Sequence, residues 1–235
     1  MIPLRDSNPV RRVPVVTYGL IAACVLVFLY ELTLEGAGRG AGLAVFFDRY
    51  GVVPSRLAAA LNRGEPTSPA VLAVLSSMFL HAGWLHLLGN MLYLWIFGNN
   101  VEDRLGRPLY LGFYLAGGVV AALAQVAVAP GSQVVLVGAS GAIAAVLGAY
   151  LVLYPGARVL SLVFFGLFYQ LVNVPAVIVL GLWFVLQLLP GITSLGAETA
   201  TGGGTAFFAH IGGFAAGMVA GLIVRAGTAR PMGVG

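Results

Sequence analysis

The sequence has few charged residues and contains no lysine. Charged residues make up 9% of the 235 residues, whereas soluble domains carry about 25%, and all twelve basic residues are arginines. This scarcity excludes an ordinary soluble globular protein. The arginines form no basic run interleaved with aromatic residues, so nothing supports nucleic-acid binding. The single cysteine, Cys24, excludes an intramolecular disulfide framework.

Long apolar segments take the place of the missing charges. Hydrophobic residues make up 60% of the chain, and the mean hydropathy is +0.97. The runs stay apolar over about 20 residues, as membrane helices do, whereas a β-barrel would show short alternating segments. We therefore predict an all-α, polytopic membrane protein, a bundle of six transmembrane helices. The predicted spans are 13–31, 73–100, 108–128, 138–155, 174–190 and 205–224.

The arginines predict the orientation of this bundle. In the six-span arrangement eight of the twelve lie on one side, which the positive-inside rule assigns to the cytoplasm. Residues 1–12 and 226–235 then form cytoplasmic tails around a membrane domain at 13–225. Hydropathy alone also permits a seventh span over 159–174, but it would put the C-terminal arginines outside, so we prefer an interfacial or re-entrant segment. The composition of the first external loop, 32–72, is compatible with a position in the membrane interface or in solvent.

Several polar side chains lie inside the apolar spans, where they are costly and usually functional. The candidates are His81, His86 and Asn90 on the second span, Ser140 on the fourth and His210 on the sixth. At 1.5 Å per residue, Ser140 and His210 lie about 21 and 22 Å from the cytoplasmic ends of their spans. Asn90 and His86 lie at about 18 and 24 Å. In a hydrocarbon core of about 30 Å these four side chains share one layer, nearer the external face.

Small residues predict that the fourth and sixth spans pack closely. Glycines that recur at four-residue steps let two helix backbones approach each other. Gly213, Gly217 and Gly221 of the sixth span follow this four-residue step, and the fourth span offers the small residues Gly141, Ala144, Ala145 and Gly148. Such packing would bring the Ser140 hydroxyl within hydrogen-bond reach of the His210 ring.

This pair suits nucleophilic catalysis, because a serine hydroxyl is a poor nucleophile until an adjacent base takes its proton. His210 can be that base for Ser140. The acidic residues lie in loops, tails or span ends, so we expect a dyad in which packing, rather than a carboxylate, orients the histidine. Donors to a developing oxyanion can come from His86, Asn90 and the backbone N–H of Ser140 at the start of its helix.

Structural interpretations compete with each of these roles. A serine in a glycine-rich helix is usually a packing residue, and a membrane histidine can be a proton relay or an interhelical hydrogen bond. His81 lies near the external interface, which favours a structural or rim role. The tryptophans fit interface anchors or core packing, although one could gate the site. The three histidines could also ligate zinc, which is a weaker alternative. The sequence lacks the H-E-x-x-H motif of intramembrane zinc proteases and the Gly-x-Gly-Asp motif of intramembrane aspartyl proteases.

Four ordered motifs resemble those of the rhomboid family of intramembrane serine proteases. The second span carries the H-x4-H-x3-N pattern from His81 to Asn90, followed by an E-x-R-x-G turn at residues 102–106. Gly138-Ala139-Ser140-Gly141 resembles the nucleophile motif, and Ala209-His210-x-x-Gly213-x-x-x-Gly217 resembles the base helix. The resemblance extends over roughly residues 13–225.

The resemblance implies Ser140 as the nucleophile, His210 as the base, and His86 with Asn90 in the oxyanion hole. His81, Gly138, Gly141, Gly213 and Gly217 are then accessory residues. It also implies an intramembrane serine endopeptidase that hydrolyses peptide bonds in or near transmembrane segments, without metal or nucleotide. Its partners would be transmembrane protein substrates and the lipid bilayer, and its location a bacterial plasma (inner) membrane.

The sequence departs from the family pattern at two places. Many members carry an aromatic residue four positions after the serine, stacked on the histidine, where this chain has Ala144; Phe207 or Phe208 could hold His210 instead. The Trp-Arg pair of some members is not evident in the first loop, where residues 50–54 resemble another bacterial branch. We expect the glycine-rich segment 191–204 to form a mobile cap. The alternative from a different class is a non-catalytic membrane-protein binder; a channel or transporter would show repeat symmetry.

Overall fold

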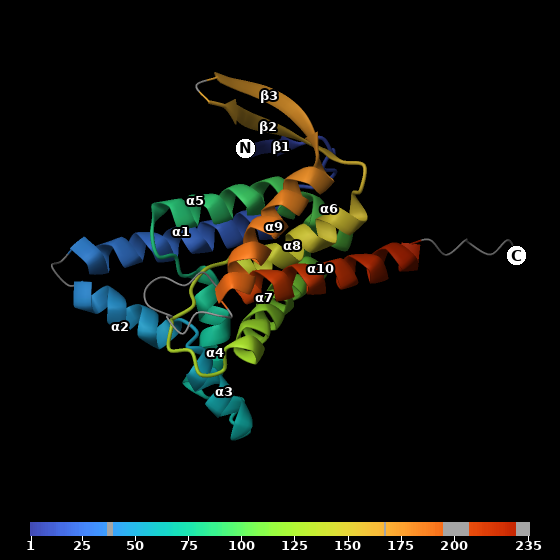
Figure 1. Ribbon diagram of the computed structural model, residues 1–235. Helices are drawn as coiled ribbons and strands as arrows, with labels where there is room; N and C mark the ends of the chain where they lie inside the picture. Colours follow the sequence, from blue (N-terminus) through green and yellow to red (C-terminus); the bar gives the residue numbers. More distant parts are fainter. Residues whose placement is uncertain (37–39, 167, 195–206, 229–235) are drawn as a thin grey trace, which may run out of the picture.

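The computed structural model describes residues 1–36, 40–166, 168–194 and 207–228, and these are mostly helical. The helices form a bundle, with a small sheet on one side of it next to the N-terminus (Figure 1). The α-helices are α1 (Val15–Gly36), α2 (Gly40–Tyr50), α3 (Pro54–Asn62), α4 (Pro69–Ser76), α5 (Trp84–Tyr93), α6 (Asn99–Leu105), α7 (Arg107–Val128), α8 (Ser140–Leu153), α9 (Ala176–Ser194) and α10 (Phe207–Thr228). Two short turns, η1 (Ser77–Phe79) and η2 (Leu94–Gly98), extend α4 and α5.

Three of the described helices, α1, α7 and α10, are long and apolar enough to cross a membrane. A fourth candidate span combines α4 and η1 with the helical stretch from α5 to α6, and the two parts are bent by 79°. Counted over the residues whose side chains the structure describes, the apolar helices Ser140–Leu153 and Ala176–Leu186 are shorter than a span. These helices identify an integral membrane protein, and the count of six spans stays a prediction.

The prediction of one continuous second span over 73–100 is wrong at its external part. After η1 the chain becomes extended at Leu80, with φ −85° and ψ 145°, and the helix resumes only at Trp84. The predicted layer therefore contains a helix break. His81 lies in the non-helical connection, whereas His86 lies in the first turn of α5.

The close approach of α8 and α10 that the glycine pattern predicts is confirmed. A Cβ added at Gly148 of α8 would collide with the backbone of α10 at Phe214. A Cβ at Gly217 of α10 would collide with the backbone of α8 at Ala145. The two helices are thus in backbone-to-backbone contact, which only glycine allows at these positions.

A buried carboxylate secures the start of α1. Glu102, in the E-x-R-x-G turn, accepts hydrogen bonds from the backbone N–H groups of Val16 and Thr17 at 3.0 and 2.7 Å. It also accepts one from the Thr17 hydroxyl at 2.8 Å. These donors belong to the first turn of a helix, where no intrahelical acceptor exists. Gly106, with φ +80°, then turns the chain between α6 and α7.

Several arginines gather at this same end of the bundle. The Arg11 N–H donates to Asp103, and the Arg107 guanidinium donates to the carbonyl of Val13. At the end of α10, Arg225 donates to a carbonyl near the end of α8. The helices α2 and α3 follow the other end of α1 (Figure 1). The chain therefore has an arginine-rich end, which agrees with the one-sided charge distribution read from the sequence.

The segment 159–174 forms a β-hairpin, so the all-α prediction is wrong for this part of the chain. Strands β2 (Arg158–Phe165) and β3 (Phe168–Pro175) pair antiparallel, and β1 (Ile2–Asp6) pairs antiparallel with β2, giving the order β1-β2-β3. The run is rich in the valine and aromatic residues that favour strands. Gly166, with φ +63°, begins the turn. Residues 2–6, which the sequence analysis assigned to the N-terminal tail, thus form an edge strand of this sheet.

Polar contacts anchor this sheet to the helices. The hydroxyl of Tyr150, near the end of α8, donates to the carboxylate of Asp6 at 2.8 Å. The side-chain amide of Asn100 on α6 donates to the same carboxylate at 2.8 Å, and the Asn8 amide donates to the Tyr150 hydroxyl at 2.7 Å. Burial raises the pKa of Asp6 above its ordinary value.

We predict that Gly217→Ala destabilises the protein by about 1–3 kcal/mol, the usual cost of overpacking. The new methyl group has to push the α8 backbone away. Gly227→Ala is the matched control on the same helix, because nothing lies within 4 Å of a Cβ there. Thermal unfolding in detergent, followed by circular dichroism, measures both. An unchanged melting temperature for Gly217→Ala would contradict the backbone contact.

Candidate active site

The structure brings Ser140 and His210 together, as the sequence predicts. The Oγ of Ser140 lies 2.6 Å from the Nε2 of His210, which is hydrogen-bonding distance. Ser140 is the first residue of α8, and His210 lies in the first turn of α10. His210 is only 7% exposed. The close contact between the two helices therefore places a buried imidazole against a serine hydroxyl, the arrangement that a nucleophile and its base require.

An aromatic side chain from α9 packs against the histidine. The ring of Trp183 lies 5.9 Å from that of His210, at an interplanar angle of 46°. Trp183 also stacks on Phe214, one turn further along α10, at 6.1 Å. The sequence proposed Phe207 or Phe208 for this role, but the ring contact that the structure shows is with Trp183. The predicted cap extends from the last residues of α9 into 195–206, which lie outside the described residues.

His86 and Asn90 share one face of α5 and line the same cavity as the pair. This cavity has a volume of about 240 Å³, and Ser140, His210 and Trp183 are also part of its wall. The side chain of Asn90 is buried, and its amide nitrogen has no hydrogen-bond partner among the described residues. A buried donor without an acceptor is costly, so this amide is available to a group that enters the cavity.

His86 faces the nucleophile motif at close range. A Cβ added to Gly138 would lie 2.6 Å from the Nε2 of His86 and 3.6 Å from the Oγ of Ser140. Gly138 also has φ +127°, which side chains rarely adopt. A glycine is therefore required here twice, for the backbone conformation and for the approach of the imidazole. On the other side of His86, its Nδ1 accepts a hydrogen bond from the Ala82 N–H at 3.4 Å.

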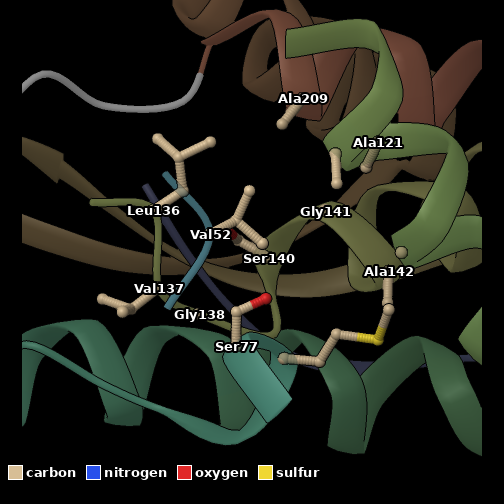
Figure 2. A pocket seen from close by; sticks show the side chains of 13 residues that line it. Val52, Ser77, Ala121, Leu136, Val137, Gly138, Ser140, Gly141, Ala142 and Ala209 are labelled. Atoms are coloured by element: carbon tan, nitrogen blue, oxygen red, sulfur yellow. The ribbon is translucent and has the colours of Figure 1, made fainter. Parts of the chain in front are cut away.

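The segment that leads into α8 is held by backbone hydrogen bonds to the first loop and to η1. Val52 and Leu136 exchange N–H···O bonds at 3.0 and 2.7 Å, and the Gly138 N–H donates to the carbonyl of Ser77 at 2.9 Å. A second cavity, of about 40 Å³, lies among these residues and also touches Ser140 (Figure 2). Ser140 thus lies between a larger and a smaller cavity. Nothing in the sequence indicated that the first loop contributes to this wall.

A carboxylate contacts the connection that contains His81, a contact that was not predicted from the sequence. Glu31 of α1 is only 2% exposed, and both of its oxygens accept from the His81 N–H, at 3.2 and 3.3 Å. The reason is that α1 continues to Gly36, beyond the predicted end of the first span, so Glu31 lies within the helix. The sequence did contain a signal for this position, because Glu31 directly follows an apolar helix that could continue past it.

Of the two roles predicted for His81, structural or at the rim, the structure favours the structural one, because the residue is only 1% exposed. Its Nδ1 lies 3.2 Å from the carbonyl oxygen of Phe79, and its ring lies 5.2 Å from that of His86. Within the described part of the chain, no group of three or more His, Cys, Asp or Glu side chains is arranged to hold a metal ion.

Comparison with known proteins adds a family to this geometry. A family model of the rhomboid domain matches residues 69–227, which include α5, α8 and α10. Rhomboid protein 1, mitochondrial, of Saccharomyces cerevisiae is 32% identical over 97 residues, covering 40% of this chain and 28% of the relative. Presenilin-associated rhomboid-like protein, mitochondrial, of Homo sapiens is 34% identical over 97 residues, covering 40% and 25%.

A bacterial relative matches a longer stretch. Rhomboid protease GluP of Bacillus subtilis is 34% identical over 138 residues, covering 59% of this chain and 24% of the relative. The chain spans between 24% and 28% of the length of these three relatives.

We predict that Gly138→Ala lowers the reactivity of Ser140 towards a fluorophosphonate by about 10²-fold, the order expected when a reacting group is displaced by about 1 Å. The added methyl group displaces the imidazole of His86 and forces a different backbone angle before α8. Gly131→Ala is the matched control in the same connection, where nothing lies within 4 Å of a Cβ. Gel fluorescence of labelled protein measures the rate. Equal labelling of both variants would refute the close approach.

Proposed function

The chain belongs to the rhomboid family, and from this membership we propose that it is an intramembrane serine endopeptidase. The observation that carries the proposal is the 2.6 Å approach of the Ser140 Oγ to the His210 Nε2. This pair lies at the starts of two closely packed helices of a membrane protein. A role in binding alone would need neither a serine hydroxyl nor a histidine in hydrogen-bonding contact.

The proposed reaction is acyl transfer to Ser140 followed by hydrolysis. The Oγ attacks the carbonyl carbon of the substrate peptide bond while its proton moves to the Nε2 of His210. His210 then gives that proton to the leaving amine, and the C–N bond breaks. A water molecule attacks the resulting ester, its proton passes to His210 and on to Ser140, and the free carboxyl product leaves.

Three donors are available for the oxyanion of both steps. They are the Nε2–H of His86, the unpartnered amide of Asn90 and the backbone N–H of Ser140. The last has no intrahelical acceptor because Ser140 begins α8. Donors that are already aimed at the developing charge, in a site from which bulk water is excluded, stabilise the transition state more than they would in water.

The two cavities suit the two reactants of hydrolysis. The larger one lies between α5 and α9 and is lined by Leu85, Tyr93 and Trp183 as well as the site residues, and the Leu85 side chain is exposed. We assign it to an apolar segment of a transmembrane substrate that arrives from the lipid side. The smaller cavity, of about 40 Å³, has room for water, which needs about 10–15 Å³ by this measure.

The proposed setting is the plasma membrane of a bacterium, with both termini in the cytoplasm. The arginine-rich end of the bundle supports the orientation. The similarity to a Bacillus subtilis protein supports the bacterial membrane. The proposed partners are transmembrane protein substrates and the lipid bilayer.

The first test is labelling of the purified protein with a fluorescent fluorophosphonate. Ser140→Ala and His210→Ala should both abolish the labelling, because one removes the nucleophile and the other its base. Ser161→Ala is the matched control, a serine that is fully buried in β2. Labelling that persists in Ser140→Ala would refute the dyad. A folded wild type that never labels would favour a non-catalytic membrane-protein binder.

A second prediction concerns the oxyanion. Asn90→Ala should lower kcat for cleavage of a transmembrane reporter by about 10-fold to 10³-fold, because one donor to the oxyanion is lost. Asn173→Ala, on the exposed strand β3, controls for loss of an asparagine elsewhere. An unchanged kcat would remove Asn90 from the oxyanion hole.

A further inference from the structure

The helix break between η1 and α5 creates backbone donors that need partners. Inside an apolar medium every N–H and C=O must find a partner within the protein, and the extended residues after Phe79 cannot use the regular helical pattern. The Leu80 N–H donates to the carbonyl of Ser77 at 3.3 Å. The next two donors are those of His81 and Ala82, and both are taken up by side chains.

One face of α1 holds this break in place. Cys24, Phe28 and Glu31 follow each other at steps of four and three residues, so they share a helix face. The Cys24 thiol lies 3.9 Å from the carbonyl of Met78, before the break. The ring of Phe28 packs edge-on against Trp84 at 4.9 Å, after the break.

The third member of this face is Glu31, whose polar side chain contacts the broken stretch of backbone directly. Its carboxylate receives the N–H of His81, which sets the path of the chain at the residue directly before Ala82. The Ala82 N–H then points at the Nδ1 of His86. A carboxylate on α1 is therefore connected, through two backbone groups, to an imidazole that lines the active-site cavity.

The contact from Ala82 determines where the proton of His86 is. A neutral imidazole has one N–H donor and one acceptor nitrogen. Because the Nδ1 accepts from Ala82, the proton is on the Nε2, and the Nε2 is the nitrogen that faces Gly138 and Ser140. In the other tautomer the Nε2 would present a lone pair to the oxyanion and would repel it.

We propose that Glu31 is a positioning residue: by holding the His81 N–H it keeps Ala82 against His86 and fixes the His86 proton on the Nε2. Its role in the reaction rests on the proposed function, whereas its effect on the tautomer does not. Glu31 itself touches neither Ser140 nor His210 in the hydrogen bonds described above. It acts on the oxyanion donor through the backbone of the break.

The tautomer can be measured without any turnover. The chain has only three histidines, so uniform ¹⁵N-histidine labelling in a Ser140→Ala background gives three imidazoles, and His86→Ala identifies the signal of interest. We expect the wild-type His86 ring to show a protonated Nε2 and an unprotonated Nδ1. Glu31→Leu should give a mixture of tautomers, and Glu31→Gln, which keeps an oxygen acceptor, should retain the wild-type spectrum.

Glu35→Leu is the matched control, because Glu35 is an exposed glutamate one turn further along the same helix. Glu31→Asp, which withdraws the carboxylate by one methylene, gives an intermediate change and replaces Glu31→Leu if that variant does not fold. A wild-type ring protonated on the Nδ1 would overturn the proposal. So would a His86 spectrum that stays unchanged in both Glu31→Leu and Glu31→Asp.

Kinetics separate this proposal from the proposed function. With Ser140 intact, Glu31→Leu should lower kcat by about 10-fold to 10²-fold, part of the effect of losing an oxyanion donor, with KM unchanged and Glu31→Gln close to the wild type. A merely structural role would lower the amount of folded protein and leave kcat per labelled site intact. A mixture of tautomers with normal kcat would overturn the oxyanion role of His86 and leave the control of its tautomer by Glu31 standing.

Discussion

Backbone contact between α8 and α10 sets the distance on which the rest of the site depends. At Gly148 and Gly217 the backbone of one helix occupies the space that a side chain would fill on the other. Larger residues at these positions would separate the helix axes and draw His210 away from Ser140. In a membrane no hydrophobic effect pushes helices together, so close packing of small residues has to supply the association. The same contact therefore stabilises the fold and assembles the proposed dyad.

The residues of the proposed chemistry lie where helices begin. Ser140 opens α8, His86 lies in the first turn of α5, and His210 lies in the first turn of α10. The first N–H groups of a helix have no intrahelical acceptor, which is expensive in an apolar medium unless a partner exists. Glu31 and the His86 ring satisfy the donors at the break before α5, while the Ser140 N–H is proposed to serve the substrate. The break before α5 and the start of α8 thus both leave backbone donors, which side chains satisfy at the break and which we propose to serve the substrate at Ser140.

The sequence predicts the parts of this arrangement that follow from local spacing. The small residues that bring α8 and α10 together are regular features of single helices, so their spacing was sufficient to predict the contact of Ser140 with His210. The break before α5 depends on contacts from α1, and the β-hairpin at 159–174 depends on pairing with residues 2–6. Neither is local. Trp183 was ambiguous for the same reason, since only the packing of α9 shows that its ring meets His210.

The contacts of α8 bear on which element could admit the proposed substrate. At its end, the Tyr150 hydroxyl is bound to Asp6, and along its length it is in backbone contact with α10. Moving α8 would break the dyad and these contacts together. The helix α9 packs on α10 through large side chains instead, with Phe184 4.8 Å and Trp183 6.1 Å from Phe214, measured between ring centres. Large side chains can adjust to a displacement by changing rotamer, whereas the contact of α8 with α10 at Gly148 and Gly217 is between backbones. Since Trp183 also packs on His210, opening at α9 would expose the proposed base to the proposed substrate.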